Sequence, residues 1–359
     1  MTLRRTLFLI LILAPAVSGS LACRSKYPRG LYAEVSTNKG LIVLRLEFEK
    51  TPMTAANFVG LAEGTIDNTA LPPGTFYFNG SKWHRVVPGH VIQCGKPTDG
   101  KIEGPGYQFP NEIDPALNHD KAGMVGMANS GPHTNGSQWY ITLADRSYLN
   151  GSYTVFGEVI QGMDVIKTIV QGDDVIAVKI VRIGRTAGQF RPTTASFKKM
   201  VAAAEDGVAK ETAERTAREE ELVQSRWPKT IAGENGVRFM ILTGGQGKPA
   251  AAGMIIKAVY SGQSLLGGLT FVSTADAGKP YRGEMPEPFE FEVGKTKINP
   301  GLDAALGQME KGEKRMLIVP AEQAYGRNGF YAKQRPKEKR FVIPPFSMLV
   351  YEVEILDIR

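Results

Sequence analysis

Cysteine, histidine and long apolar runs are scarce in this chain of 359 residues. Two cysteines cannot form a disulfide framework or a cysteine-based zinc site, and four scattered histidines argue against a histidine-rich metal cluster. No apolar run reaches the roughly 20 residues that a membrane-spanning helix needs. We therefore expect neither a metal ion nor another cofactor, and no transmembrane segment.

Glycine, proline and basic residues are abundant by comparison. The 40 glycines and 22 prolines favour turn-rich β structure, while a hydrophobic fraction of 42% is ample for a core and excludes a disordered chain. At about 150 residues per domain, the length predicts two domains and a smaller remainder. The net charge of +7 includes two arginines of residues 1–22 and many bases near Lys333–Arg340, so we attribute it to a local loop and expect no nucleic-acid partner.

The first 22 residues have the pattern of a secretory signal peptide. A basic start with Arg4 and Arg5 precedes the apolar run Leu7–Leu13 and a stretch of small residues that ends at Ala22. The apolar run is too short to span a bilayer. We expect export to the envelope of a bacterium, as a periplasmic or membrane-anchored protein.

Cys23 directly follows this segment. Leu21-Ala22-Cys23 resembles the bacterial lipobox, in which the cysteine is lipidated after cleavage, so we expect a lipid on Cys23. Ser20 stands where that motif prefers a larger aliphatic residue, which leaves ordinary cleavage after Ala22 as the alternative. The lipid is the one membrane contact that we predict.

The first half of the mature chain is rich in short β-branched segments separated by Gly, Asn and Pro, a spacing typical of a barrel or sandwich. Val86–Gln93 is one predicted strand. Two helices interrupt the pattern, at Met53–Ala62 and Gly162–Ile169. The first of them is predicted to have Thr51 as its N-cap and Pro52 in its first turn.

Residues 196–226 differ from their surroundings, because they are rich in Ala, Glu, Lys and Arg and contain no proline. This composition predicts a charged helix that ends at Trp227 and connects two domains. A coiled-coil or partner-binding helix is the alternative. Strand patterns return beyond it, around one helix at Gly301–Met309 with Asn299 as its N-cap and Pro300 at its first position.

Two segments of the first domain carry the most specific motif, Trp83–Gly95 and Gly126–Ile141, and Tyr148–Gly151 and Tyr153–Gly157 continue it. Together they resemble the signature segments of the cyclophilins over about residues 31–186. The resemblance implies a closed antiparallel β-barrel capped by two helices, with peptidyl-prolyl cis-trans isomerase activity.

That activity needs no nucleophile or cofactor, because rotation about an X-Pro bond only has to overcome amide resonance. In the twisted state the prolyl nitrogen regains its lone pair, and a fixed cationic donor stabilises it there. Arg85 is our candidate for this donor. By motif position, Gln93 and Gln138 bind the substrate backbone, and Asn129 holds the strand beside the proline. These four residues form the predicted catalytic set.

The resemblance also implies an apolar pocket for the proline ring and a strand that binds the substrate backbone. The predicted substrate-binding residues are His90, Val91, Met127, Ala128, Ser130, Tyr140, Tyr148, Leu149 and Tyr153. Three of them depart from the usual pattern: His90 replaces Phe, Val91 replaces Met, and Tyr153 replaces the His of many cyclophilins. We expect His90 to narrow or polarise the pocket.

A second motif set lies in order over about residues 230–359 and resembles the FK506-binding proteins (FKBPs). It includes Val259–Gly262, Pro288–Phe291, Ile298–Leu302, Val319–Gly326 and Val350–Ile355. The resemblance implies an antiparallel sheet wrapped around one helix, with an apolar proline pocket. The predicted pocket residues are Tyr260, Phe271, Phe289, Ile298, Leu302, Tyr325, Ile343 and Tyr351. Val272 stands where the family usually has an Asp, so we expect this domain to be slow or chiefly to bind.

The sequence thus predicts a mainly β and α+β chain of five parts. These are a signal peptide (1–22), a short tether (23–30), a cyclophilin-like domain (31–186), a charged helical linker (187–229) and an FKBP-like domain (230–359). We expect an exported, monomeric isomerase that assists folding of proline-containing polypeptide clients. The alternative is a holdase or scaffold that binds such segments with little turnover, especially through its second domain.

Overall fold

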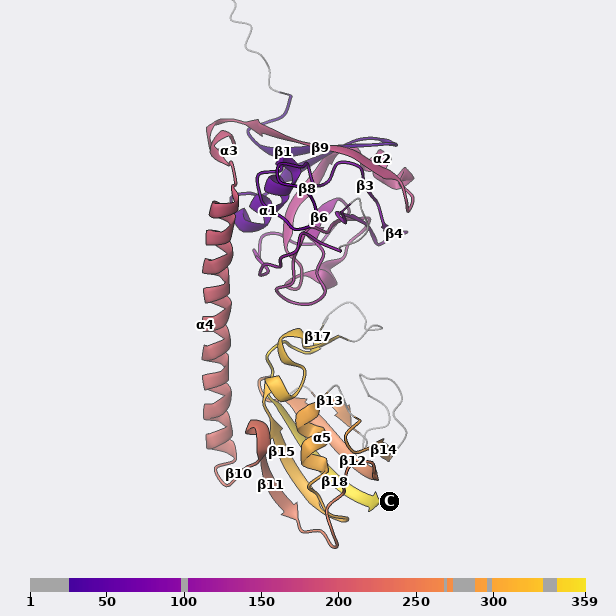
Figure 1. Ribbon diagram of the computed structural model, residues 1–359, viewed down its shortest axis with the longest axis vertical. Helices are drawn as coiled ribbons and strands as arrows, with labels where there is room; N and C mark the ends of the chain where they lie inside the picture. The colour runs from indigo at the N-terminus through magenta and orange to yellow at the C-terminus, as the bar shows by residue number, and fades with distance from the viewer. Residues whose placement is uncertain (1–25, 98–102, 268–269, 274–287, 296–298, 332–340) are drawn as a thin grey trace, which may run out of the picture.

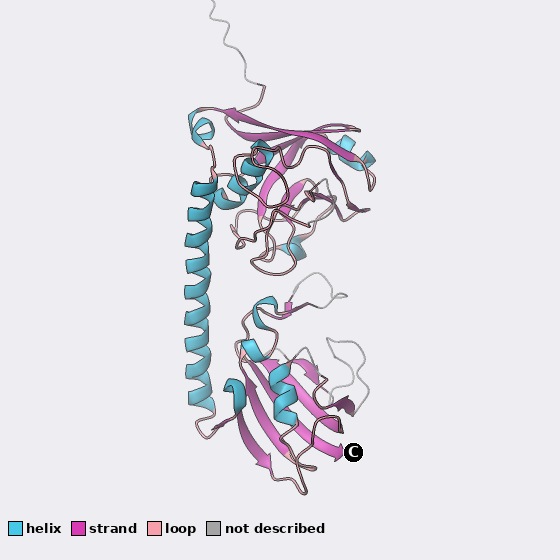
Figure 2. Cartoon of the chain, viewed as in Figure 1, coloured by secondary structure: helices cyan, strands magenta, loops and turns pink. Residues whose placement is uncertain are grey.

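The computed structural model describes residues 26–97, 103–267, 270–273, 288–295, 299–331 and 341–359 (Figure 1). The predicted signal peptide, Cys23, Ile298 and the whole basic segment 333–340 lie outside these residues. Two antiparallel sheets, each with its own hydrophobic core, are connected by one long helix. Figure 2 shows that strands dominate both ends of the molecule.

The first sheet has nine strands in the order β3-β9-β1-β2-β8-β6-β7-β5-β4. The strands are β1 (Gly30–Thr37), β2 (Gly40–Leu46), β3 (Ser81–Lys82), β4 (Arg85–Val87), β5 (Val91–Cys94), β6 (Met124–Met127), β7 (Trp139–Thr142), β8 (Val155–Gln161) and β9 (Asp174–Ile183). All neighbours pair antiparallel.

The two edge strands of this sheet, β3 and β4, follow each other in the chain and are joined by Trp83 and His84. Among the described strands no ladder connects β3 to β4. The sheet is therefore a curled antiparallel half-barrel, and the predicted closed barrel is not confirmed. The predicted strand Val86–Gln93 is instead a hairpin, because Gly89 adopts φ 67° and the N–H of His90 bonds the carbonyl of Val87.

Two helices lie against this sheet where the sequence predicts them, α1 (Pro52–Glu63) and α2 (Met163–Thr168). Thr51 precedes α1, but its side chain does not cap the helix and instead donates to the carbonyl of Glu47. The carboxylate of Glu112 accepts from the first N–H groups of α1, those of Met53 and Thr54, at 3.0 and 2.8 Å. A residue distant in sequence thus supplies the cap that helix N-termini require.

Short helical segments complete this domain: η1 (Ser147–Leu149) and α3 (Arg185–Gln189). The core between α1 and the sheet is aromatic. Trp83 and Trp139 are fully buried and cross at a centroid distance of 5.4 Å. Cys94 lies in the same cluster, and its complete burial raises the pKa of the thiol well above its ordinary value.

The long helix is α4 (Thr194–Arg226), which begins two residues before the predicted start. Thr193 and Ser196 form a reciprocal capping box that explains this start. No helix among the described residues, α4 included, is long and apolar enough to cross a membrane. Its charged side faces solvent, whereas Phe197, near its start, is buried in the first core.

The second sheet is arranged in the order β10-β11-β15-β18-β12-β13, and β14 also pairs with β12. The strands are β10 (Ile231–Ala232), β11 (Arg238–Thr243), β12 (Ile255–Ser264), β13 (Thr270–Ser273), β14 (Phe289–Glu292), β15 (Lys314–Val319) and β18 (Leu349–Ile358). A separate pair comprises β16 (Phe330–Tyr331) and β17 (Phe341–Ile343). The short 3-10 segments are η2 (Glu234–Gly236), η3 (Ala321–Gln323) and η4 (Gly326–Asn328).

One helix, α5 (Pro300–Leu306), packs against the inner face of this sheet. Asn299 caps it by accepting from the N–H of Leu302 at 3.3 Å, as the sequence predicts. The helix ends at Leu306, before the predicted end at Met309. The outer face of the sheet is also apolar, and the last turns of α4 cover it.

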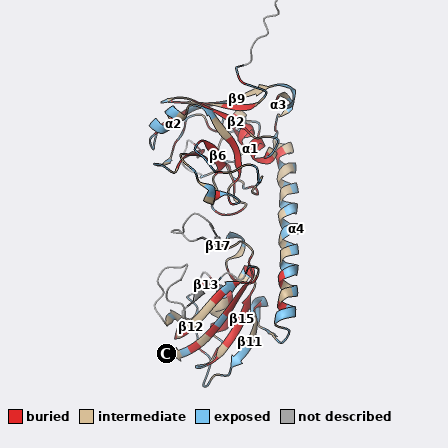
Figure 3. Cartoon of the chain, turned by 180° about the vertical axis from the view of Figure 1, so that it is seen from behind, coloured by how far each residue is buried: buried red, intermediate tan, exposed pale blue. Residues whose placement is uncertain are grey.

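The alternation along β15 produces these two faces. Leu317 and Val319 belong to the inner core with α5, whereas Met316 and Ile318 lie in a second cluster with Val223 of α4. Both views of the molecule show α4 running alongside the two sheets (Figures 1 and 3). The helix is therefore a packed element of both domains, and not only the charged connector that the sequence predicts.

Replacing Phe197 by Ala tests this packing. The Phe197 ring contacts the rings of Tyr107 and Phe109, with centroids 5.5 and 5.6 Å apart. Removing a buried aromatic side chain costs about 3–5 kcal/mol. We expect F197A to lower the free energy of unfolding of the first domain by that amount, measured with urea. In a W227F background, the fluorescence reports only Trp83 and Trp139 of that domain.

The matched control is K198A, because Lys198 is exposed on the same turn of the helix. It is expected to change the free energy of unfolding by less than about 0.5 kcal/mol. A loss below about 1 kcal/mol in F197A would show that α4 does not contribute to the first core.

Candidate functional site

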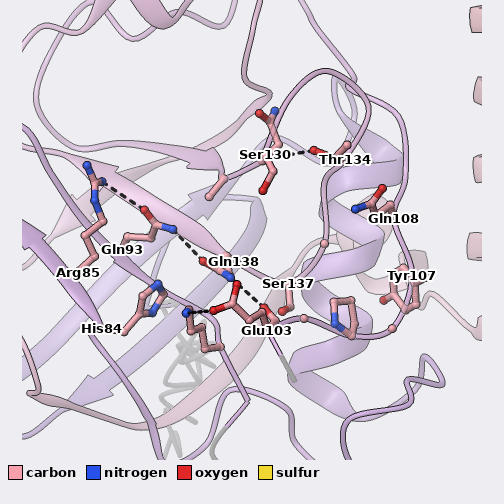
Figure 4. A pocket seen from close by; sticks show the side chains of 17 residues that line it. His84, Arg85, Gln93, Glu103, Tyr107, Gln108, Ser130, Thr134, Ser137 and Gln138 are labelled. Carbon is pink, nitrogen blue, oxygen red and sulfur yellow. Dashed lines mark hydrogen bonds and ion pairs between the residues drawn. The ribbon is translucent and has the colours of Figure 1, made fainter. Parts of the chain in front are cut away.

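Three of the four predicted catalytic residues form a row of hydrogen bonds on the first sheet. Arg85 of β4 pairs in register with Gln93 of β5. Nη1 of Arg85 donates to Oε1 of Gln93 at 3.3 Å, and Nε2 of Gln93 donates to Oε1 of Gln138 at 2.9 Å (Figure 4). Nε2 of Gln138 then donates to the carbonyl of Glu103 at 2.9 Å. The side-chain amides of Gln93 and Gln138 are thereby oriented, and Gln93 holds the guanidinium of Arg85 at one end of the row.

Arg85 is exposed, and within the described part of the chain no carboxylate forms an ion pair with it. Its charge is therefore available to a ligand. The side chains of this row line a hollow of about 860 Å³, which Asn129 also lines. All four predicted catalytic residues thus face one space. Lys96 and Glu103, which form an ion pair of 2.7 Å, bound its far side.

Asn129 differs from the other three, because its side-chain amide already has partners in the protein. Nδ2 donates to the carbonyl of Ser152 at 3.2 Å and lies 3.4 Å from Oδ1 of both Asn111 and Asn135. These bonds hold the loop that follows β6. The geometry suits the predicted role of holding the strand beside the substrate.

An apolar cluster adjoins this hollow. It contains Val91, Tyr140 and Leu149, all nearly buried, against which Ala128, Tyr148 and Tyr153 pack. Ala128 belongs to the cluster and also lines the hollow, so the two are continuous. Six of the predicted substrate-binding residues are therefore brought together beside the row of polar side chains.

Two further predicted residues occupy different places. Ser130 is exposed and lines the hollow, next to the predicted backbone-binding residue Ala128. Met127 does not join the apolar cluster, since its side chain is 1% exposed and packs in the main core of the sheet. Strand alternation explains this, because Met127 and Ala128 are neighbours and face opposite sides. The prediction that Met127 lines the pocket is at odds with this placement.

The floor of the apolar cluster contains a polar pair that sequence reasoning missed. The hydroxyl of Tyr140 lies 2.8 Å from Nε2 of the buried His119. Oδ1 of Asn150 accepts from the backbone N–H of His119 and lies 2.9 Å from Nδ1. Since this oxygen can only accept, Nδ1 of His119 carries a proton, and in the neutral ring Nε2 accepts from the Tyr140 hydroxyl. Gly126 leaves room for this ring, because a Cβ there would collide with Tyr140.

His90 is held by an arginine that no motif indicated. Nε of Arg146 donates to Nδ1 of His90 at 2.9 Å, and the guanidinium also bonds the carbonyl of Gly89. The imidazole stacks on Tyr148, with centroids 6.2 Å apart and an interplanar angle of 23°. Desolvation lowers the pKa of His90, and the nearby Arg146 and Arg85 lower it further.

His90 is consequently a neutral aromatic ring at neutral pH, with its proton on Nε2. It lies near the position of the phenylalanine that the cyclophilin motif carries there. The polarising effect expected from the sequence is limited to one N–H group.

The second domain also brings its predicted residues together. Phe271, Ile343 and Tyr351 are buried, and Tyr260, Leu302 and Tyr325 pack against them. Phe289 meets Tyr260 edge to face at 5.5 Å. Ile298 lies outside the described residues. Val272 lies in β13, paired with Gly262 of β12.

Two details fix the ring of Tyr351 in this cluster. Nδ2 of Asn299, the residue that caps α5, donates to the Tyr351 hydroxyl. Gly262 is needed beside it, because a Cβ there would lie 2.6 Å from the Tyr351 ring and 2.7 Å from Phe271. The cluster therefore serves as core as well as candidate pocket.

Comparison with known proteins agrees with both motif sets. The model of the cyclophilin type peptidyl-prolyl cis-trans isomerases matches residues 32–186, and the model of the FKBP-type peptidyl-prolyl cis-trans isomerases matches residues 247–356. Both resemblances predicted from the sequence are thereby confirmed.

Individual relatives match the first domain. A probable peptidyl-prolyl cis-trans isomerase A of Mycobacterium bovis is 43% identical over 153 residues, covering 40% of this chain and 84% of the relative. A human peptidyl-prolyl cis-trans isomerase-like 1 is 39% identical over 145 residues, covering 40% and 80%. A crystal structure of a cyclophilin type isomerase from Cryptosporidium parvum covers 43% of this chain and 98% of its own, at 26% identity and a TM-score of 0.37.

Arg146 is predicted to tune the histidine of the pocket. R146M removes one of the two cations that face His90, so we expect the pKa of His90 to rise toward its ordinary value. Titration of the imidazole signals by NMR measures this, and only four histidines have to be assigned. R191M, at an exposed arginine outside the site, is the control. An unchanged or lower pKa in R146M would contradict the contact.

Proposed function

The chain belongs to the cyclophilin-type peptidyl-prolyl cis-trans isomerases, and an FKBP-type isomerase domain follows its cyclophilin-type domain. On this premise we propose that the protein is an exported folding enzyme whose first domain performs most of the catalysis. The enzyme class follows from the two domains and from the curated relatives. Its substrates are proline-containing polypeptides. The observation that carries the proposal is the oriented row of Arg85, Gln93 and Gln138 beside an apolar cluster.

The reaction needs a twisted amide to be stabilised more than a planar one. The barrier of about 18–20 kcal/mol reflects the loss of resonance between the prolyl nitrogen and the preceding carbonyl. As the bond twists, the nitrogen becomes pyramidal and its lone pair can accept a hydrogen bond. Arg85 donates there as a fixed cation, and the planar ground state offers no comparable acceptor. This difference between the two states lowers the barrier.

Orientation of Arg85 makes the stabilisation effective. A free arginine side chain would lose rotamer freedom on meeting the transition state. Here Gln93 holds Nη1, and Gln138 holds Gln93, before the substrate arrives. A reduction of about 7 kcal/mol in the barrier corresponds to an acceleration of roughly 10⁵-fold. The substrate backbone can exchange bonds with the two amides while the proline ring enters the apolar cluster.

The apolar cluster contributes by excluding water from the ring and from the rotating bond. Tyr140 is fixed by its hydroxyl bond to His119, so its ring presents a rigid wall. His90 and Tyr148 form a stacked pair at a second wall. With His90 neutral, the wall can accept a proline ring without burying a charge.

The second domain is proposed to act mainly through desolvation. Its cluster contains aromatic rings from β12, β14 and β18, and an apolar pocket disfavours the more polar, planar amide. Because Val272 replaces the family's usual acid, we propose that this domain binds clients and turns them over slowly.

Replacement of Arg85 tests the assignment of the first site. In the full chain, we expect R85A to lower kcat/KM by about 10²–10³-fold in a protease-free NMR assay on a proline tetrapeptide, since one transition-state donor is lost. R85K is the matched control. Its kcat/KM should lie between those of R85A and the unaltered chain, because lysine keeps the positive charge but lacks the planar guanidinium. Equal activity of R85A and the unaltered chain would exclude the proposed site.

The residual activity of R85A reports on the second domain. Tyr325 is partly buried in the second cluster, so Y325L in the R85A background is expected to retain the fold. We expect the double variant to lose the activity that R85A retains. If R85A suppresses aggregation of an unfolded client as well as the unaltered chain does, with negligible turnover by either, the holdase interpretation replaces the enzyme.

Location in a bacterial envelope is the second part of the proposal. Arg4 and Arg5, the apolar run Leu7–Leu13 and the small residues before Cys23 support export and lipid attachment.

Cys23 is expected to decide membrane retention. C23S should move the protein from the membrane fraction to the soluble fraction of a bacterial host, because its lipid is lost. Metabolic labelling with a radioactive fatty acid measures the modification directly. C94S is the control, since Cys94 is fully buried in the first core. Membrane retention of C23S equal to that of the unaltered chain would contradict lipid anchoring.

A further inference from the structure

A cleft of about 680 Å³ lies between the two domains, apart from both clusters described above. Three separate parts of the chain form its walls. They are loops of the first domain around Pro132 and His133, the middle of α4 around Val208, and Pro345 and Phe346 of the second domain. Its volume lies within the range of roughly 300–1,000 Å³ that is typical of ligand sites.

The middle of α4 is the uncovered part of an otherwise buried helix face. The same face packs against the first core through Phe197 and Met200, and against the second sheet through Leu222 and Val223. Between them, residues at helical spacing line the cleft: Ala204, Gly207, Val208, Glu211, Thr212 and Arg215. Ala204 still packs against the first core, but neither core includes the residues from Gly207 to Arg215, which offer Val208 and the carboxylate of Glu211 to the cleft.

The first-domain wall continues from the proposed catalytic site. Ala128 and Ser130 line the catalytic hollow, and Pro132 and His133, a few residues on, line the cleft. Thr134 braces this loop, because its hydroxyl donates to the carbonyl of Gly131 at 2.7 Å and accepts from the N–H of Ser130 at 2.9 Å. One loop therefore separates the two spaces, and a chain that crosses it passes from one to the other.

The second-domain wall likewise adjoins the second cluster. Ile343 belongs to that cluster, and Pro345 and Phe346 follow it into the cleft. The two domains also lie side by side at Gly131 of the first domain and Asn328 of the second. If Gly131 carried a Cβ, that atom would lie 3.2 Å from Oδ1 of Asn328. The cleft is thus bounded on one side by the loop that follows Ser130 of the first site, and on the other by residues that follow Ile343 of the second cluster.

The residues on these walls suit an extended polypeptide. Ile113 is 44% exposed, and it lines the cleft together with Val208 and Phe346, so three apolar side chains from separate parts of the chain share this space. Glu211 adds a carboxylate, whereas Arg215 also lines the cleft but is paired with Glu219 at 3.5 Å and bonded to Ser347 at 2.9 Å. We propose that the cleft binds an extended segment of the client polypeptide that flanks the proline in the first site. This inference rests on the proposed function, and it assigns the cleft to the client's flanking residues.

Peptide length provides the test. The full chain is assayed by NMR exchange on a proline tetrapeptide and on a 20-residue peptide with a central proline and mixed apolar and polar flanks. We expect KM for the long peptide to be at least 5-fold lower. G207W is designed to fill the cleft, because Gly207 lines it and a Cβ there meets nothing within 4 Å. It should remove the gain from length and leave the tetrapeptide unchanged.

A209W is the matched control, because Ala209 is exposed and lies two residues further along the helix, on its opposite side. It is expected to keep the full gain from length. I113D changes a different wall and should lose the gain as G207W does. The same gain in G207W and I113D as in the unaltered chain would overturn the proposal.

The two proposals fail separately in this design. If no protein turns over the tetrapeptide, the proposed function is wrong, and fluorescence anisotropy of the labelled long peptide still measures the cleft. Binding that G207W and I113D weaken at least 5-fold, and A209W does not, would support the cleft in that case. Equal binding by all four proteins would overturn it.

Discussion

One helix face that is buried in two separate places determines how this molecule is arranged. The start of α4 inserts Phe197 into the core of the first domain, and its end covers the outer face of the second sheet with Val223. Polar contacts reinforce the second end. The buried carboxylate of Glu219 accepts from the backbone N–H of Met348 at 3.2 Å, and Arg215 donates to Ser347 at 2.9 Å. The helix thereby holds the two isomerase domains on either side of one cleft.

The catalytic site depends on a second constraint, the orientation of a single cation. Gln93 of β5 bonds Arg85 and is itself held by Gln138, the residue before β7, so the guanidinium is oriented although no carboxylate of the described residues pairs with it. The apolar walls are fixed in the same way by polar groups behind them, namely His119 behind Tyr140 and Arg146 behind His90. Polar side chains thus fix the rings that line the apolar pocket, while the residues of the pocket itself carry no charge.

The sequence predicted the parts of this account that depend on local order. Motif spacing located Arg85, Gln93 and Gln138, and capping signals located α5 with Asn299 at its start. The remaining features depend on contacts between distant residues, which no local pattern records. Glu112 replaces Thr51 as the cap of α1. The composition of residues 196–226 indicated a charged connector between domains, but the packing of α4 was not predicted, because its apolar face is narrow and is divided between two cores.

The central claim is that α4 holds both domains as one body. Residual dipolar couplings of the deuterated full chain, measured in one weakly aligning medium, test it directly, because each domain reports its own alignment. The account predicts that a single alignment tensor fits the amide couplings of both sheets. Two tensors that differ in magnitude or orientation would show that the domains move independently, and would contradict a shared cleft.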